Sequence, residues 1–178
     1  TYDSLPLQNR GDYVNFNGLM AKAMGQRLLN NTIKLNNGQI TQLNGSGEIE
    51  EQLRQMEKLY QKQLQRETYF LFVSTPHKAS PYEDLLPVGT KDWYQIKINS
   101  LLVEFENRGI PYLDQQKQLY QEGYRSEDAF FDTDSHWTPR TAFWAYTKIM
   151  EQMVDTGVID PVDPMFLSLD HFASTSYP

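Results

Sequence analysis

The sequence predicts an α/β fold with a parallel sheet, and three observations lead to this prediction. Two apolar, β-favouring runs, at residues 68–73 and 110–114, alternate with three amphipathic segments at 49–64, 90–108 and 138–153. Such an alternation is typical of βαβ units, whose strands pair in parallel. The first run is continuously apolar, as expected for a strand that is buried on both faces.

The composition is that of a folded domain, and it excludes several classes of function. The 178 residues include 16 Lys and Arg against 23 Asp and Glu, which gives a net charge of −7, and they contain no cysteine. The acidic balance argues against nucleic-acid binding, which requires a concentrated basic face. The lack of cysteine excludes disulfides and thiolate metal sites. No run approaches the roughly 18–20 apolar residues that a membrane span needs.

A covering segment at residues 1–46 is expected ahead of the α/β domain at residues 47–178. It opens with a short helical pattern and continues with two stretches, 32–35 and 39–43, in which apolar and polar residues alternate. Asn36-Asn37-Gly38 separates them. Because Asn-Gly readily adopts positive φ angles, this pattern predicts a β-hairpin.

Each amphipathic segment carries signals for the ends of a helix. In the first segment one face carries the apolar residues Ile49, Leu53, Met56, Tyr60 and Leu64. The second is expected to begin after Thr90 as its N-cap and to end at Gly109. The third begins with Thr138-Pro139, an N-cap followed by a first-turn proline, and ends near Gly157.

The candidate catalytic residues follow from the position of loops in a parallel sheet. Functional groups gather where strands end and loops lead into helices, which selects the loops at 74–87, 114–116 and 132–138. The last loop holds Asp134 two residues before His136. Such an acid can accept the Nδ1 proton of the imidazole and leave Nε2 free as a general base, as in a Ser–His–Asp system. Asp134 and His136 are therefore the candidate catalytic pair.

Two other interpretations of this loop stay open on the sequence alone. Because Asp-x-His occurs often by chance, Asp132 and Asp134 also fit turn or capping residues, and His136 also fits an ordinary loop histidine. Alternatively, Asp132, Asp134 and His136 alternate as a mixed oxygen and nitrogen set that a metal ion accepts. No other His or acid cluster is placed to complete such a coordination sphere.

The segment Asp134-Ser135-His136-Trp137-Thr138-Pro139 resembles the Asp-x-His-Trp-Thr-Pro segment of SGNH-hydrolase-like proteins of the alginate O-acetyltransferase (AlgX/AlgJ-like) and DHHW types. The similarity extends to residues 70–87, which match their strand and Pro/Lys loop, and to the entry segment at 9–18. This resemblance implies a flavodoxin-like, three-layer α/β/α fold, with Asp134 and His136 as the acid and base of a catalytic triad.

The resemblance also implies a function. Members of this type carry out O-acetyl transfer or acetyl-ester hydrolysis on an exported polysaccharide, without a cofactor and with a membrane protein as a possible acetyl donor. An extracellular or cell-envelope location is therefore expected. Because residue 1 is Thr and no leader is present, a signal or anchor is expected to have been removed. The alternative is a non-catalytic carbohydrate-binding or scaffold module that keeps the fold.

The nucleophile is the part of the triad that this sequence does not supply. Family serines follow the Asp-x-His segment in a Gly-Asp-Ser-type turn after a further strand, and no such turn follows His136. The domain is therefore expected to be truncated at its C-terminus, with the serine outside this chain. Ser4 is an accidental match to a Gly-Asp-Ser turn, and Ser74 is expected to be a hydrogen-bonded turn serine.

Two further side chains are candidates for substrate binding. Trp137 flanks the proposed base, where an indole ring can shape a cleft or hold the imidazole in place. Lys78 lies in the loop after the first predicted strand, where its ammonium can offer positive charge to an acidic glycan.

Overall fold

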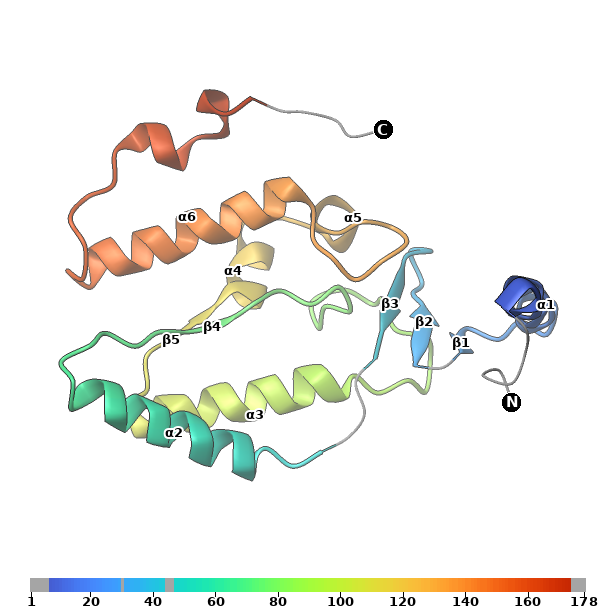
Figure 1. Cartoon of the computed structure of the whole chain (residues 1–178), viewed down its shortest axis with the longest axis horizontal. Helices are drawn as coiled ribbons and strands as arrows, with labels where there is room; N and C mark the ends of the chain where they lie inside the picture. The colour runs from blue at the N-terminus through green and yellow to red at the C-terminus, as the bar shows by residue number, and fades with distance from the viewer. Residues whose placement is uncertain (1–6, 30, 44–46, 174–178) are drawn as a thin grey trace.

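The computed structural model describes residues 7–29, 31–43 and 47–173 (Figure 1). The helices are α1 (Leu7–Ala23), α2 (Glu50–Leu64), α3 (Trp93–Arg108), α4 (Gln115–Gln121), α5 (Ser126–Ala129) and α6 (Pro139–Asp155), followed by the 3₁₀ helices η2 (Pro164–Leu167) and η3 (Leu169–His171). The strands are β1 (Leu28–Leu29), β2 (Thr32–Lys34), β3 (Ile40–Gln42), β4 (Phe72–Ser74) and β5 (Tyr112–Asp114). Ser4 lies outside the described residues.

The predicted parallel pairing is confirmed by β4 and β5, which run side by side with Ser74 opposite Asp114. In Figure 1 this pair lies between α2 and α3 on one side and α6 on the other. The sheet has only two strands in the described part of the chain, so the predicted three-layer parallel sheet is present only in part. β4 is also shorter than predicted, because β5, its partner in the described part of the chain, offers three residues to pair with.

An apolar cluster joins α2 and α3 to the parallel strands. Its buried members are Leu53, Leu101, Leu102, Phe105 and Ile110. The ring of Phe105 is fully buried and meets Phe72 of β4 edge to face, at a centroid distance of 5.0 Å. The amphipathic pattern therefore places α3 against the strand pair, as predicted.

The caps of α3 differ in part from the prediction. Asp92, rather than Thr90, is the N-cap, and its Oδ1 accepts a hydrogen bond of 3.0 Å from the backbone N–H of Gln95. Thr90 lies before the start of the helix, in a turn that is closed by a hydrogen bond from its N–H to the carbonyl of Pro87. The C-terminal prediction is confirmed by Gly109, which adopts a φ of 64° that favours glycine.

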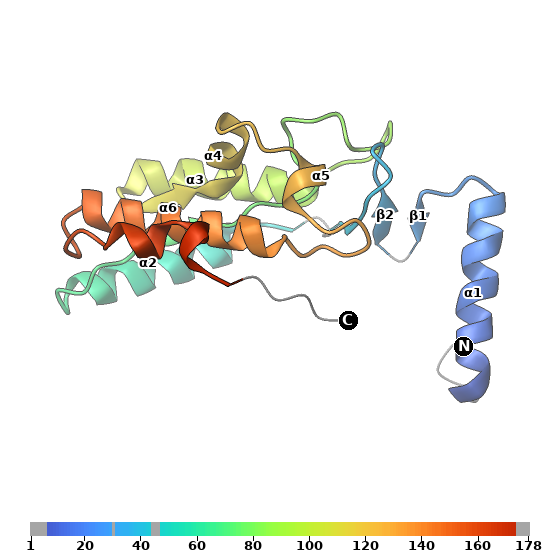
Figure 2. The same ribbon diagram turned by 90° about the horizontal axis from the view of Figure 1, so that it is seen from above.

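The hairpin predicted between residues 32 and 43 is confirmed. β2 and β3 pair antiparallel, with Ile33 opposite Thr41, and β1 adds a third strand that the sequence pattern did not predict. Ile33 and Leu35 are buried against Ala79 and Leu85, which belong to the loop after β4. The hairpin thus covers this loop, whereas α1 extends away from the rest of the chain (Figure 2).

A second apolar cluster packs α6 against α4 and α5. Its buried members are Leu119 of α4, Ala129 of α5, Phe130 directly after α5, and Trp144 and Ala145 of α6. The predicted N-cap of α6 is confirmed, since the Oγ of Thr138 accepts a hydrogen bond of 3.3 Å from the N–H of Thr141. Across the described residues, every helix falls short of the length and apolarity that crossing a bilayer demands.

Candidate active site

The three loops selected by the strand-end rule meet in the structure. Ser74 and Asp114 lie opposite each other at the carboxyl ends of β4 and β5. The amide of Gln116 accepts a hydrogen bond from the N–H of His77 and donates one of 3.2 Å to the hydroxyl of Ser80. The third loop joins them through Lys78, whose ammonium donates to the carbonyl of Asp134.

Asp134 and His136 form the contact that their spacing predicts. Oδ1 of Asp134 accepts a hydrogen bond of 2.7 Å from the backbone N–H of His136 and lies 3.3 Å from Nδ1 of its imidazole. The imidazole is 80% exposed and the carboxylate 53% exposed. With Nδ1 facing the carboxylate, Nε2 is the nitrogen available to a reacting group, as a general base requires.

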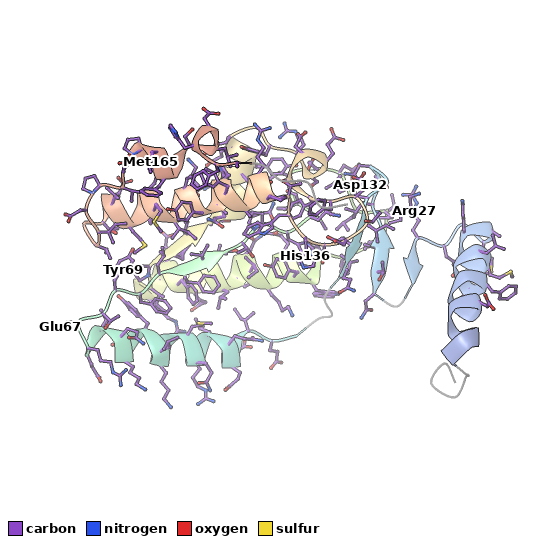
Figure 3. All side chains as sticks on the ribbon, turned by 45° about the horizontal axis from the view of Figure 1, so that its top comes forward. Arg27, Glu67, Tyr69, Asp132, His136 and Met165 are labelled. Atoms are coloured by element: carbon purple, nitrogen blue, oxygen red, sulfur yellow. The ribbon has the colours of Figure 1, made fainter. Side chains whose placement is uncertain are left out.

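The loop that carries this pair is closed at its base by backbone hydrogen bonds. Phe130 and Trp137 form an antiparallel bridge, and the N–H of Phe131 donates to the carbonyl of His136 over 3.1 Å. The N–H of Ile40 in β3 donates to the carbonyl of Asp132 over 2.9 Å. Figure 3 shows Asp132 and His136 on this loop, beside the hairpin. The antiparallel hairpin therefore supports the loop from one side.

His136 borders a small cavity of about 190 Å³, lined by Thr75, Pro76, Phe130, Ser135, His136 and Trp137. Pockets that enclose drug-sized ligands measure about 300–1,000 Å³. The cavity is therefore large enough for a small acyl group. Trp137 is part of the same lining as the imidazole, and its predicted role in substrate binding stays a prediction.

Lys78 is placed differently from a solvent-exposed loop lysine. Its side chain has 0% exposure, and Nζ donates to the carbonyls of Ile40 at 2.9 Å and of Phe131 and Asp134. Burial lowers the pKa of this ammonium, although the carboxylates of Asp134 and Asp132 act in the opposite direction. This placement does not favour the predicted contact with an acidic glycan, because every ammonium proton is directed into the protein.

The metal alternative is not supported by the structure. No group of three His, Asp or Glu side chains able to hold a metal ion occurs within residues 7–29, 31–43 and 47–173. Asp132 instead accepts a hydrogen bond of 3.4 Å on Oδ1 from the amide of Gln39. Asp132, Asp134 and His136 therefore do not converge on one point, although they alternate along the chain.

Several residues at the site were not predicted individually. Thr75 and Pro76 line the cavity directly after β4, where the strand-end rule indicated a loop but not which of its residues face His136. Gln39 donates from the hairpin to the carbonyls of Ser126 and Phe130, and no local pattern marks such a long-range contact. Ser74 is 2% exposed and its hydroxyl has no hydrogen-bond partner among the described residues, where the expectation of a hydrogen-bonded turn serine is therefore wrong.

Two comparisons with known proteins found similar proteins. Residues 35–165 match the family model of the SGNH hydrolase-like domain of the acetyltransferase AlgX. Among solved structures, the chain is similar to Bacillus cereus PatB1, determined with a sulfonyl adduct, with a TM-score of 0.59 and 21% identity over 70% of this chain and 43% of the PatB1 chain. The chain thus spans less than half the length of PatB1. The comparison with curated proteins gave no match.

The family match covers the loop after β4, the Asp134–His136 loop and the second strand of the hairpin, which together form the site. At this level of identity the PatB1 likeness supports the fold alone. The chain therefore belongs to the family of SGNH hydrolase-like domains of the acetyltransferase AlgX type.

Proposed function

We propose that this chain is the acid–base half of an O-acetyl-transferring or acetyl-ester-hydrolysing domain, acting on an exported polysaccharide. The observation that carries the proposal is the Asp134–His136 pair, whose imidazole borders a small cavity that is also lined by Thr75 and Pro76, directly after the parallel strand β4. A serine outside this chain supplies the nucleophile. Membership of the AlgX-type family supports acetyl as the transferred group.

In the proposed reaction His136 moves a proton in two directions. Nε2 takes the proton of the serine hydroxyl as its oxygen attacks the acetyl carbonyl carbon, and Asp134 stabilises the imidazolium that forms. The imidazolium then returns the proton to the departing alkoxide, which leaves an acetyl-serine. In the second half, a polysaccharide hydroxyl or water loses its proton to Nε2 as it attacks the same carbon. The bond to the serine oxygen then breaks, and the imidazolium returns the proton to that oxygen.

The topology supports a nucleophile that enters beside β4. Helix α3 connects β4 to β5 on one face, and α6 follows β5 on the opposite face. Crossover connections between parallel strands are almost always right-handed, so a strand after α6 pairs with the free edge of β4. Residues that follow such a strand lie at the carboxyl end of the sheet, next to the loop after β4. The order of the strands reverses there, and ligands bind at such a point in open α/β sheets. This added strand also extends the two-stranded sheet towards the full three-layer fold.

The cellular setting is part of the same proposal. An acetyl transferase for an exported polysaccharide works in the cell envelope or outside the cell, and it receives its acetyl groups from a membrane protein that carries them across. Family membership is the support for this setting, together with an acidic net charge of −7 that suits neither nucleic acid nor an anionic lipid surface.

Acetyl-ester hydrolysis by a protein that carries this chain and the residues that follow it tests the proposal. We expect p-nitrophenyl acetate to be hydrolysed, and His136→Ala to lower kcat by about 10⁶-fold, as loss of a triad base does. Asp134→Asn is expected to lower kcat by about 10⁴-fold, because the imidazole loses its orienting acceptor.

The matched control is His171→Ala, which removes an exposed histidine of η3 and is expected to leave the rate unchanged. Full activity in His136→Ala would overturn the proposal. Absence of hydrolysis in every form, combined with glycan binding by calorimetry, would instead favour a non-catalytic carbohydrate-binding or scaffold module.

A further inference from the structure

Lys78 is the most deeply buried charged side chain near the candidate site, and its surroundings account for each of its protons. It has 0% exposure and makes three hydrogen bonds, all to backbone carbonyls, from Ile40, Phe131 and Asp134. A lysine ammonium has three N–H donors and no acceptor, so its capacity is fully used. A buried charge is costly unless it is hydrogen-bonded in this way, which makes the arrangement specific to an ammonium.

The three carbonyls belong to segments that are far apart in the sequence. Ile40 lies in β3 of the hairpin, whereas Phe131 and Asp134 lie on either side of the turn that precedes His136. Both loop carbonyls must point inward to reach the same nitrogen. This fixes the direction of the backbone at Asp134, whose carboxylate then meets the N–H and Nδ1 of His136.

We propose that Lys78 is a positioning residue for the Asp134–His136 pair, holding the loop in the conformation that brings the carboxylate to the imidazole. The inference rests on the proposed function, because it assigns a role toward the same pair. The hairpin also holds this loop. The carbonyl of Ile40 accepts a hydrogen bond from Lys78, and the N–H of Ile40 donates one to the carbonyl of Asp132. The antiparallel segment is thereby part of the site's framework.

If Lys78 has this positioning role, its ammonium group, and not the volume of its side chain, should determine the tautomer of the His136 imidazole. The chain contains no cysteine, so Lys78→Cys introduces a single thiol that can be alkylated in the unfolded protein before refolding. Bromoethylamine then gives an aminoethyl thioether that ends in an ammonium at nearly the length of lysine. Bromopropane gives a propyl thioether that differs only by a methyl group in place of that ammonium.

The readout is the ¹⁵N NMR spectrum of the His136 imidazole at a pH where the ring is neutral. We expect the wild type and the aminoethyl form to show the Nδ1–H tautomer, in which Asp134 accepts the proton and Nε2 is free. We expect this signal to be lost in the propyl form and replaced by the Nε2–H tautomer that free imidazole side chains favour. The indole N–H of Trp144, which donates to Glu122 over 2.6 Å, reports whether the packing of α6 is intact.

Identical His136 spectra in the ammonium and propyl forms, with the Trp144 signal unchanged, would overturn the inference. If the propyl form fails to fold, reductive methylation of the folded wild type tests whether the ammonium of Lys78 is held by these three carbonyls. Lys58 and Lys62 are exposed and should be methylated, whereas Lys78 should resist until the protein unfolds. Methylation of Lys78 as fast as Lys58 would show that its ammonium is not held by these carbonyls, and would contradict the inference. Neither readout depends on esterase activity, so failure of the proposed reaction is distinguishable from failure of this role.

Discussion

His77 and His136 are loop histidines in opposite environments, and this difference has a measurable consequence for stability. His136 is 80% exposed, whereas the side chain of His77 is only 15% exposed. The ring centroids of His77 and Tyr94 are 4.6 Å apart, and Nδ1 of His77 lies 3.9 Å from Oδ2 of Asp92. Burial lowers the pKa of His77 below its usual value of 6.5, although the carboxylate of Asp92 acts against this.

The lowered pKa of His77 predicts that acid destabilises the protein in a particular range. Between the folded and unfolded pKa values the unfolded chain binds more protons, so the free energy of unfolding rises with pH there. Stability should therefore be constant above the unfolded value of about 6.5 and should fall as the pH is lowered through it. Thermal unfolding between about pH 5 and 7 measures this slope, in a range where most carboxylates stay ionised.

The variant His77→Gln should flatten that slope, because it removes the group that gains the proton on unfolding. His171→Gln is the control, since this exposed histidine should leave the slope as it is in the wild type. An unchanged slope in His77→Gln would show that another group is responsible.

Residue-level predictions from sequence succeeded where the contact is local. The two-residue spacing of Asp134 and His136 is enough to bring carboxylate and imidazole together, and the structure shows this contact. The environment of Lys78 was not predictable, because it depends on carbonyls at Ile40, Phe131 and Asp134 that no pattern near residue 78 indicates. A lysine in a Pro-rich loop reads as solvated unless the tertiary fold is known.

At the scale of elements, the N-cap of α6 links the stability of a helix to the candidate site. The hydroxyl of Thr138 accepts from the N–H of Thr141 and lies two residues after His136. Thr138→Ala should lower the free energy of unfolding by about 1 kcal/mol, because a helix N–H loses its acceptor. Urea unfolding measures the change.

Ser100→Ala is the matched control for this cap. Its hydroxyl donates to the carbonyl of Ile96 inside α3 and satisfies no N–H at a helix end. We expect no loss of stability from it, since alanine is the better helix former at an interior position. Equal losses in the two variants would refute the capping role of Thr138.

Helices were predicted more faithfully than strands, for a physical reason. Helix α6 contains its own hydrogen bonds, and Thr138-Pro139 and Gly157 mark its ends locally. The length of β4 depends instead on its partner, so the apolar run at residues 68–73 yields a strand only at Phe72–Ser74, where β5 pairs with it. β1 has two residues and owes its assignment to β2 alone.

At the scale of the whole molecule, two small sheets with different roles meet at one site. The parallel pair β4–β5 brings the strand-end loops together, and the antiparallel hairpin supports the Asp134–His136 loop through Ile40. The sequence patterns predicted the parallel strands and the hairpin, but they did not predict that the hairpin packs beside the loops that follow the parallel strands. Apolar contacts of Ile33 and Leu35 with the loop after β4 join them, together with Lys78 and backbone groups that carry no sequence signature.

We propose that His136 activates a serine outside this chain, and covalent labelling tests this proposal most directly. In a protein that includes the residues after Pro178, phenylmethylsulfonyl fluoride should react at one serine, whose oxygen bonds to sulfur as fluoride leaves. Mass spectrometry of the digested protein locates the adduct. We predict a single labelled serine beyond residue 178 and its loss in His136→Ala, with the His171→Ala control labelled as the wild type is. Labelling that is equally fast in His136→Ala, or that falls on no serine at all, would contradict the account.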